Sequence, residues 1–383
     1  MQNRICSRTV LDDTVPGILY DENGVANYCE IYDILARTYP KGSKGESEWN
    51  ELVSNIKETG KGNEYDCIIG VSGGTDSCYL LHIANGLGLR PLAVNFDNGW
   101  STEISVKNIK KVTSALNIDL ETYVVDYDEM KEILKSYMKA SFPWIDAPTD
   151  IAISGILYRI AAREGIKYVF SGSDFRSEGT QPNEWTHSDS RQLKHIVKTF
   201  SNISLKTYPN LSIKDLFYYG YLKGINMIRP FYYIEYKKKD AQQLLMNKYG
   251  WQYYGGHHHE NIFTKFAIAY WLPKKFGIDK RKITYSALIM SAQLQRDEAI
   301  KLLSEPPYDP EQMERDKDYV LKKLDISSEE FDDIWKSENK NILTYPSYFN
   351  FIHKFMKLVF PLFKYVLPWK PMMFYQMEVR KKS

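Results

Sequence analysis

The stretch DCIIGVSGGTDS, residues 66–77, decides the fold of this chain. Its first half, Asp66–Val71, is a short apolar run of the kind found in buried parallel strands. Two adjacent glycines follow, and the chain then continues as a helix from Cys78 to Gly86. A strand, a glycine-rich turn and a helix in this order can bind an anion. The glycines let backbone amides converge on it, and the start of the helix supplies the positive end of a dipole.

The turn itself predicts a cradle for a chain of phosphates, because its hydroxyl groups add donors to those of the backbone. It is not a Walker A loop, since no Gly-Lys-Ser or Gly-Lys-Thr follows. Adjacent glycines also do not fit the dinucleotide-binding pattern. The residues expected to contact the nucleotide here are Ser72, Gly73, Gly74, Thr75, Asp76 and Ser77.

Strands and helices alternate after the turn. Further apolar runs at Pro91–Phe96, Leu120–Val125 and Tyr168–Gly172 are separated by helical stretches. This alternation predicts an α/β fold with a doubly wound parallel sheet, in which ligands bind at the carboxyl ends of the strands. Beyond about residue 202 the apolar periodicity is helical. That part is expected to cover the open edge of the sheet.

The chain has 383 residues, which is more than one typical domain. We expect an N-terminal segment over residues 1–60, a nucleotide-binding domain over 61–201 and a mainly helical substrate-binding region over 202–345. An aromatic, basic tail follows over 346–383. The tail fits a helix docked on the protein better than a segment lying on a membrane surface, although both readings are open.

The composition excludes several classes of protein. A net charge of +2 gives no electrostatic indication of nucleic-acid binding. No run has the apolar length of a membrane span, and the first ten residues lack a secretory pattern. Four cysteines near the N-terminus fit free thiols, so a cytoplasmic protein is expected. The 29 tyrosines and 8 tryptophans suit a site for a polar ring, although most of them will pack in the core.

Residues 72–77 resemble the SGGxDS signature of PP-loop ATP pyrophosphatases, whose parallel sheet is of the HUP-like type. Members of that family cleave ATP between its α and β phosphates, and the resemblance implies that this loop holds the leaving pyrophosphate. Two further stretches strengthen the resemblance to this family. They are NFDNGW at 95–100, where the family contacts adenosine, and SGSDFRSEG at 171–179. The further nucleotide contacts expected from them are Asp97, Asn98, Ser171 and Gly172.

Carboxylates near a triphosphate need a cation to offset the repulsion. Asp76 and Asp174 are therefore expected to bind Mg²⁺ and to take part in catalysis. Glu178 is a further candidate catalytic carboxylate. A surface carboxylate without a role is the equal alternative for Glu178.

Three more blocks resemble the N-acetyl sugar amidotransferases of bacterial surface-polysaccharide synthesis, a family similar to WbpG, PseA and LfnA. They read PNEW at 182–185, GWQYYGGHHHE at 250–260 and LPKKFGIDKRK at 272–282. The likeness implies that ATP and ammonia convert an acetamido group of a nucleotide-linked sugar into an acetamidino group, for lipopolysaccharide O-antigen or another glycan. It also implies separate partners that supply ammonia, similar to the glutaminase and cyclase subunits of imidazole-glycerol-phosphate synthase.

These blocks supply the candidate substrate residues. Adjacent histidines point in different directions and rarely meet on one metal ion, so contacts with the sugar, its phosphates or ammonia are favoured over a metal site. A structural role for the histidines stays open, and the basic cluster in 272–282 fits either a sugar diphosphate or a solvated surface. The candidates are Trp185, His257, His259, Glu260, Lys274 and Arg281 for binding, and His258 for catalysis.

The N-terminal segment departs from the family pattern. Relatives carry two Cys-x-x-Cys pairs, which suit zinc held by four thiolates. Here Thr9 and Ala26 replace one cysteine of each pair, and only Cys6 and Cys29 remain. Because threonine and alanine cannot complete a tetrahedral site, we expect zinc to be absent.

Two other functions stay open. A PP-loop enzyme that modifies tRNA would fit the loop, but no cysteine follows Cys78 and the charge is near neutral. A non-catalytic nucleotide-binding scaffold would fit the incomplete zinc pattern. The intact loop at 72–77 argues against such a scaffold.

Overall fold

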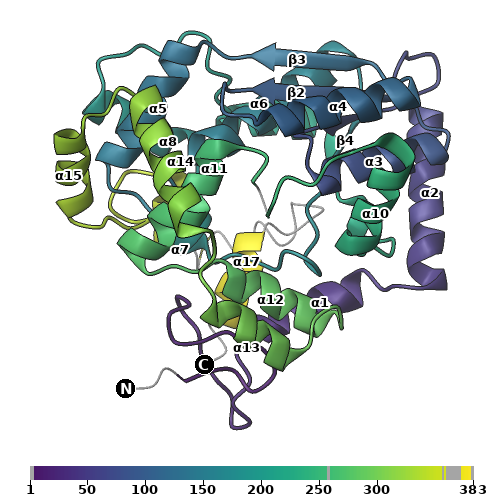
Figure 1. Ribbon diagram of the computed structural model, residues 1–383. Helices are drawn as coiled ribbons and strands as arrows, with labels where there is room; N and C mark the ends of the chain where they lie inside the picture. The colour runs from purple at the N-terminus through teal and green to yellow at the C-terminus, as the bar shows by residue number, and fades with distance from the viewer. Residues whose placement is uncertain (1–3, 257–258, 356–357, 359–371, 381–383) are drawn as a thin grey trace.

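The computed structural model of the chain contains one parallel sheet among its described residues (Figure 1). The strands lie in the order β3-β2-β1-β4-β5, and every neighbouring pair is parallel. The predicted doubly wound α/β fold is therefore confirmed. The described residues are 4–256, 259–355, 358 and 372–380. The strands are β1 (Cys67–Gly70), β2 (Pro91–Asp97), β3 (Leu120–Val124), β4 (Tyr168–Phe170) and β5 (Asn226–Ile228).

The strand order reverses at β1. From β1 the chain moves through β2 to β3 at one edge, and it then returns to place β4 on the other side of β1. The loops that follow β1 and β4 therefore leave the sheet in opposite directions. Open parallel sheets bind their ligands in the crevice that such a reversal creates.

Helices cover both faces of the sheet (Figure 1). Because successive side chains of a strand alternate between the faces, Ile68 packs in one core and its neighbours Cys67 and Ile69 pack in the other. The core around Ile68 is closed by α6 (Ala147–Arg163). The helices that close the other core are α2 (Ser43–Thr59), α3 (Thr75–Gly86), α4 (Glu103–Leu116) and α10 (Lys238–Tyr249).

The strand β5 was not predicted from the sequence. It has three residues, of which one is exposed and two are partly buried. So short a run gives no periodic signal. It pairs with β4 from Tyr168↔Asn226 to Phe170↔Ile228. The region 202–345, expected to be mainly helical, thus also completes one edge of the sheet.

Most of the remaining helices pack together beside and below the sheet in Figure 1 and share one large core. The helical periodicity expected beyond residue 202 runs through Thr284–Leu303, but the chain forms two helices there, because Ala292 adopts a left-handed backbone (φ 58°) between them. The remaining elements, of which α9 and η1 bury no residue, are α1 (Tyr28–Thr38), α5 (Tyr127–Lys139), α7 (Asn183–Thr186), α8 (Ser190–Phe200), α9 (Ile213–Phe217), η1 (Tyr218–Leu222), η2 (Pro230–Tyr232), α11 (Ile262–Phe266), η3 (Ala267–Phe276), α12 (Arg281–Met290), α13 (Arg296–Ser304), α14 (Pro310–Lys323), α15 (Ser328–Lys336) and α17 (Met372–Val379).

The described end of the C-terminal tail is docked on the body of the protein. Helix α17 packs against α1, and Phe374 and Val379 of α17 are buried. Arg380 forms an ion pair with Glu184 at 2.6 Å. The rest of the tail prediction falls largely on residues outside the described part of the chain. Within the described part, no helix is both long and apolar enough to cross a bilayer.

Candidate functional site

The predicted phosphate loop connects β1 to α3, and only glycine fits its tightest point. Gly73 has a left-handed backbone (φ 80°), and a Cβ atom there would lie 2.2 Å from the carbonyl oxygen of Ser105. The indole Nε1 of Trp251 donates to the Gly73 carbonyl at 2.9 Å. The Thr75 amide donates to the Tyr254 hydroxyl at 3.3 Å. Residues 251–254 therefore brace the loop from the C-terminal half of the chain.

A cavity of about 520 Å³ opens from this loop, a size typical of small-molecule sites. It lies over the carboxyl ends of β1, β2 and β4 and continues along the first turns of α6. Helix α6 contributes both polar and apolar side chains to its far side, and α11 contributes Thr264. The predicted site residues that line it are Ser72, Gly74, Asp76, Ser77, Asn98, Ser171, Gly172, Glu178 and Glu260.

A lysine that the sequence analysis missed holds the acidic side chain of the loop. Lys238 Nζ donates to Asp76 Oδ2 at 2.9 Å, and the Tyr236 hydroxyl donates to Asp76 Oδ1. Although burial opposes its charge, the carboxylates of Asp76, Glu178 and Glu260 raise the pKa of Lys238. A charged ammonium group is therefore fixed beside the phosphate loop. The sequence shows only three consecutive lysines, 237–239, which do not distinguish this one.

Glu260 also lies at the phosphate loop. Its Oε1 accepts a hydrogen bond from the Ser72 hydroxyl at 3.2 Å and would lie 3.0 Å from a Cβ atom at Gly74. The main chain explains this placement, because the Thr102 amide donates to the Glu260 carbonyl at 2.9 Å and ties it to the loop after β2. Asp76 and Glu260 both line the cavity at the loop, and both oxygens of Asp76 accept hydrogen bonds from Tyr236 and Lys238. No preformed cluster of three or more metal-ligand side chains exists among the described residues.

Asp174 is buried and does not line the cavity. It is 2% exposed, and its Oδ1 accepts from the Arg176 amide at 3.2 Å. Burial raises its pKa, even though Lys41 and Arg176 lie nearby. This geometry gives no support to a magnesium role shared with Asp76.

The expected adenosine contacts divide into two kinds. The Asn98 amide lines the cavity, donating to Thr149 Oγ1 at 3.2 Å and accepting from Asn261 Nδ2 at 3.3 Å. Asp97 instead closes its own turn, accepting from the Gly99 amide at 2.8 Å, and does not line the cavity. Asn98 is therefore the better placed of the two for a bound nucleotide.

Several predicted substrate residues lie away from the cavity. Trp185 is 2% exposed and packs in the large core. The Arg281 guanidinium pairs with Asp279 at 2.7 Å and donates to the carbonyls of Leu302 and Glu305, which fastens α12 to the end of α13. Lys274 is exposed on the surface, and His259, partly buried, lies beside Gly256. His257 and His258 fall outside the described residues.

The two cysteines of the incomplete zinc pattern lie side by side. Cys6 Sγ lies 3.9 Å from Cys29 Sγ, both thiols are buried, and the Ala26 amide donates to Cys6 Sγ at 3.2 Å. The hydrogen bond from Cys29 lowers the pKa of Cys6 to about 5. Threonine and alanine occupy the other two corners, so the donor set does not suit zinc.

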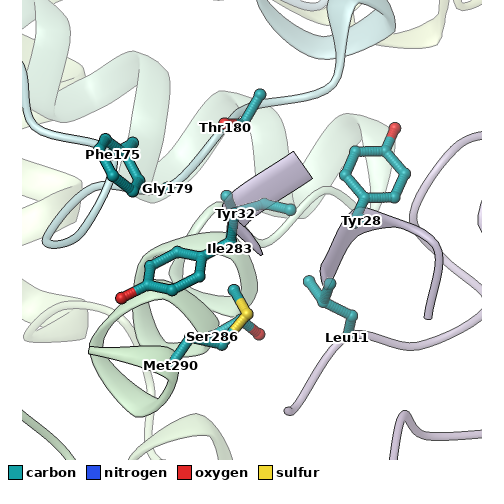
Figure 2. A pocket seen from close by; sticks show the side chains of 9 residues that line it. All are labelled: Leu11, Tyr28, Tyr32, Phe175, Gly179, Thr180, Ile283, Ser286 and Met290. Atoms are coloured by element: carbon teal, nitrogen blue, oxygen red, sulfur yellow. The ribbon is translucent and has the colours of Figure 1, made fainter. Parts of the chain in front are cut away.

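A small apolar cavity of about 20 Å³, room for about one water molecule, lies beside the N-terminal segment (Figure 2). Figure 2 shows Leu11, Tyr28 and Tyr32 of the N-terminal segment facing Ile283 and the loop after β4. The loop that carries Glu178 therefore rests on the N-terminal segment and on α12.

The C-terminal part of the chain matches a known family. Residues 260–358 fit the family model described as LPS biosynthesis protein WbpG-like, C-terminal domain. This match includes the block at 272–282 and supports the resemblance that the sequence motifs indicated over this part of the chain. We call residues 260–358 the WbpG-like domain; its residue Glu260 accepts the hydrogen bond from Ser72 of the phosphate loop.

A curated relative covers less of the chain. An uncharacterized protein of Methanocaldococcus jannaschii is 26% identical over 160 residues, which are 42% of this chain and 53% of that protein. The chain thus spans about half the length of this relative. Its description gives no activity.

Solved structures show only distant likeness. An NH3-dependent NAD synthetase from Campylobacter jejuni is 12% identical, with a TM-score of 0.30, over 65% of this chain and 94% of the other. An NMN synthetase from Francisella tularensis is 14% identical, with a TM-score of 0.28, over 61% and 94%. A predicted subunit of tRNA methyltransferase from Methanocaldococcus jannaschii is 16% identical, with a TM-score of 0.28, over 47% and 73%. These scores carry no argument about activity.

Proposed function

We propose that this chain is an ATP-dependent amidotransferase that acts on the acetamido group of a nucleotide-linked sugar during bacterial lipopolysaccharide synthesis. The observation that carries the proposal is one continuous cavity. It joins the phosphate loop at 72–77 to side chains of the WbpG-like domain, namely Glu260, Asn261, Thr264 and Lys280. Nucleotide activation and acceptor binding would then share one chamber.

The chemistry explains why such a chamber needs ATP. An amide carbon is a poor electrophile and its oxygen is a poor leaving group, and transfer of AMP to that oxygen corrects both faults. The amide oxygen attacks the α-phosphorus of ATP, the bond from that phosphorus to the β-phosphate oxygen breaks, and pyrophosphate leaves. Ammonia then adds to the activated carbon, and AMP leaves with the original oxygen. The product carries an acetamidino group.

The residues of the loop fit the first step. Gly74 and the hydroxyl-bearing Ser72 and Ser77 line the cavity, and donors at such a loop suit the oxygens of a pyrophosphate. The Lys238 ammonium adds a positive charge where negative charge develops on the leaving group. Mg²⁺ held by Asp76 and Glu260 would offset the charge of the triphosphate.

The nucleophile has to reach the chamber as neutral ammonia. We propose that separate glutaminase-like and cyclase-like subunits deliver it, as the family resemblance implies. The partner would shield ammonia from protonation on its way. Free ammonium at raised pH should replace the partner in an assay of the chain alone.

An isotope experiment tests this function. UDP-N-acetylglucosamine, UDP-N-acetylgalactosamine and CMP-N-acetylneuraminate, each labelled with ¹⁸O in the acetamido oxygen, are incubated with the chain, ATP, Mg²⁺ and ammonium. The proposal predicts ¹⁸O in AMP and an amidine product from at least one of them, detected by mass spectrometry. Consumption of acceptor with ¹⁸O appearing in inorganic phosphate, or no turnover of any acceptor, would contradict it.

A further inference from the structure

Lys280 is the cationic side chain among the described residues that line the cavity. It belongs to the basic cluster 272–282, yet it behaves differently from Lys274 and Arg281, which lie outside the cavity. Lys280 directly precedes α12. Its neighbours in the cavity are Trp144 and the first turn of α6.

The surroundings of Lys280 are held in place. Its Nζ atom lies 4.2 Å from the centre of the Trp144 ring. The Trp144 Nε1 atom donates to Asp150 Oδ2 at 2.7 Å, so the ring cannot rotate away without breaking that bond. The Thr264 hydroxyl donates to Asp146 Oδ2 at 2.5 Å. The amine of Lys280 is therefore placed over an aromatic ring whose orientation is held by Asp150.

Two influences act on the charge of this amine. Burial disfavours the ammonium form, while the carboxylates of Asp150, Glu178 and Asp146 favour it. Burial outweighs them and lowers the pKa of Lys280 to about 8. A usable fraction of neutral amine therefore exists near physiological pH, which is the condition for a base that works there.

We propose that Lys280 is the base that accepts a proton from ammonia as it attacks the adenylated acetamido carbon, an assignment that rests on the proposed function. The nitrogen lone pair of ammonia forms the new bond to carbon, which leaves a positive charge on that nitrogen. One of its protons passes to the neutral amine of Lys280. The bond from carbon to the AMP oxygen then breaks, AMP takes the electron pair, and an amidinium product remains.

The carboxylates nearby are weaker candidates for this role. Asp150 Oδ2 and Asp146 Oδ2 already accept hydrogen bonds from Trp144 and Thr264, so these oxygens are engaged with the protein. Binding of a sugar diphosphate is a poor alternative role for Lys280, because three carboxylates around it would repel phosphate. Their charge instead attracts ammonium to this end of the cavity.

Two variants separate a proton-transfer role from a charge role. Lys280→Met removes the base, and Lys280→Arg keeps a positive charge that does not deprotonate. With the acceptor that turns over, both should lose product formation by about 100-fold or more. Both should retain acceptor-dependent exchange of labelled pyrophosphate into ATP, because adenylation precedes the step. Lys301→Met, an exposed change on α13, is the matched control and should leave both rates unchanged.

The pH profile distinguishes the outcomes further. For the wild-type chain, kcat/KM for ammonia, corrected for its own ionisation, should rise with pH through a pKa near 8. The rise of kcat/KM through this pKa should be absent in Lys280→Met. Normal activity of Lys280→Arg, or an unchanged profile in Lys280→Met, would overturn the proposal. Absence of pyrophosphate exchange in the wild-type chain would instead contradict the proposed function itself.

A labelling experiment tests the residue without any turnover. The chain alone is treated with trace acetic anhydride across a pH series, and acetylation of each lysine is read by mass spectrometry. Lys280 should become reactive with a midpoint near 8, well below the ordinary value for a lysine side chain, about 10.4. Saturating ATP and acceptor should protect Lys280. A midpoint for Lys280 at the ordinary value would overturn the assignment even if the chain proved catalytically inactive.

Discussion

Lys238 Nζ lies 2.9 Å from Asp76 Oδ2, which joins the first turn of α10 to the first turn of α3. The two residues are 162 positions apart in the chain. The pair places an ammonium group beside the carboxylate of the phosphate loop. Any nucleotide bound by the loop would therefore meet a cation supplied by the C-terminal half of the chain.

Replacement of Lys238 tests this relationship. Lys238→Met should lower kcat/KM for ATP by about 100-fold, because one donor to the charge that develops on pyrophosphate is lost. Lys239→Met changes an exposed neighbour in the same helix and should have little effect. Asp76→Asn should abolish turnover while the thermal unfolding curve stays cooperative. Equal activity of the two lysine variants would remove Lys238 from the site.

Replacement of Gly73 tests the shape of the loop. Gly73→Ala should lower the free energy of unfolding by about 2 kcal/mol or more and weaken ATP binding, because its left-handed backbone and the nearby Ser105 carbonyl leave no room for a methyl group. Gly86→Ala is the control, since a Cβ atom there meets nothing within 4 Å. Chemical denaturation and calorimetric titration with ATP measure the two effects. A Gly73→Ala chain that binds ATP normally would contradict the proposed cradle.

The buried carboxyl of Asp174 should give a pH-dependent stability. Its folded-state pKa is raised by burial above the unfolded value, so its contribution to the free energy of unfolding is most favourable at low pH. This stabilising contribution is lost as the pH rises through the folded-state pKa. Asp174→Asn should therefore raise the melting temperature at pH 7, and the gain should shrink as the pH is lowered toward 4. A loss of stability at pH 7 would show that its contacts with Arg176 and Lys41 outweigh burial.

Arg281 should matter for stability rather than for substrate binding. Its ion pair with Asp279 and its bonds to the main chain at the end of α13 would be lost in Arg281→Met, at a cost of about 2 kcal/mol. The KM for the sugar acceptor should stay within error of the wild-type value. Lys274→Met, at an exposed position of the same block, should change neither quantity. A raised KM without loss of stability would restore the diphosphate-binding role.

The sequence predicted the sheet because its strong signals are local. Four apolar runs became β1 to β4, and the helical stretch expected between the second and third runs became α4 (Glu103–Leu116). Strand β5 was missed because three residues of mixed exposure have no period. Its place is decided by pairing with β4, a contact that the local sequence does not encode.

The site was predicted less completely, since side chains remote in sequence complete it. The loop at 72–77 was recognised from its glycines, but Lys238 reaches it only because α10 packs on α3. Glu260 was assigned to the substrate, whereas main-chain pairing with Thr102 holds it at the loop. Arg281 was assigned to substrate binding, whereas its guanidinium pairs with Asp279, two residues earlier in the chain.

The identity of the ATP products tests the central claim most directly. The chain, ATP labelled in the α and γ phosphates, Mg²⁺, ammonium and the acceptors named above are incubated and separated by ion-exchange chromatography. Activation at the phosphate loop predicts acceptor-dependent AMP and pyrophosphate in equal amounts, and neither in the Asp76→Asn chain. Acceptor-dependent ADP and inorganic phosphate would contradict the account, because they require cleavage at the γ phosphate.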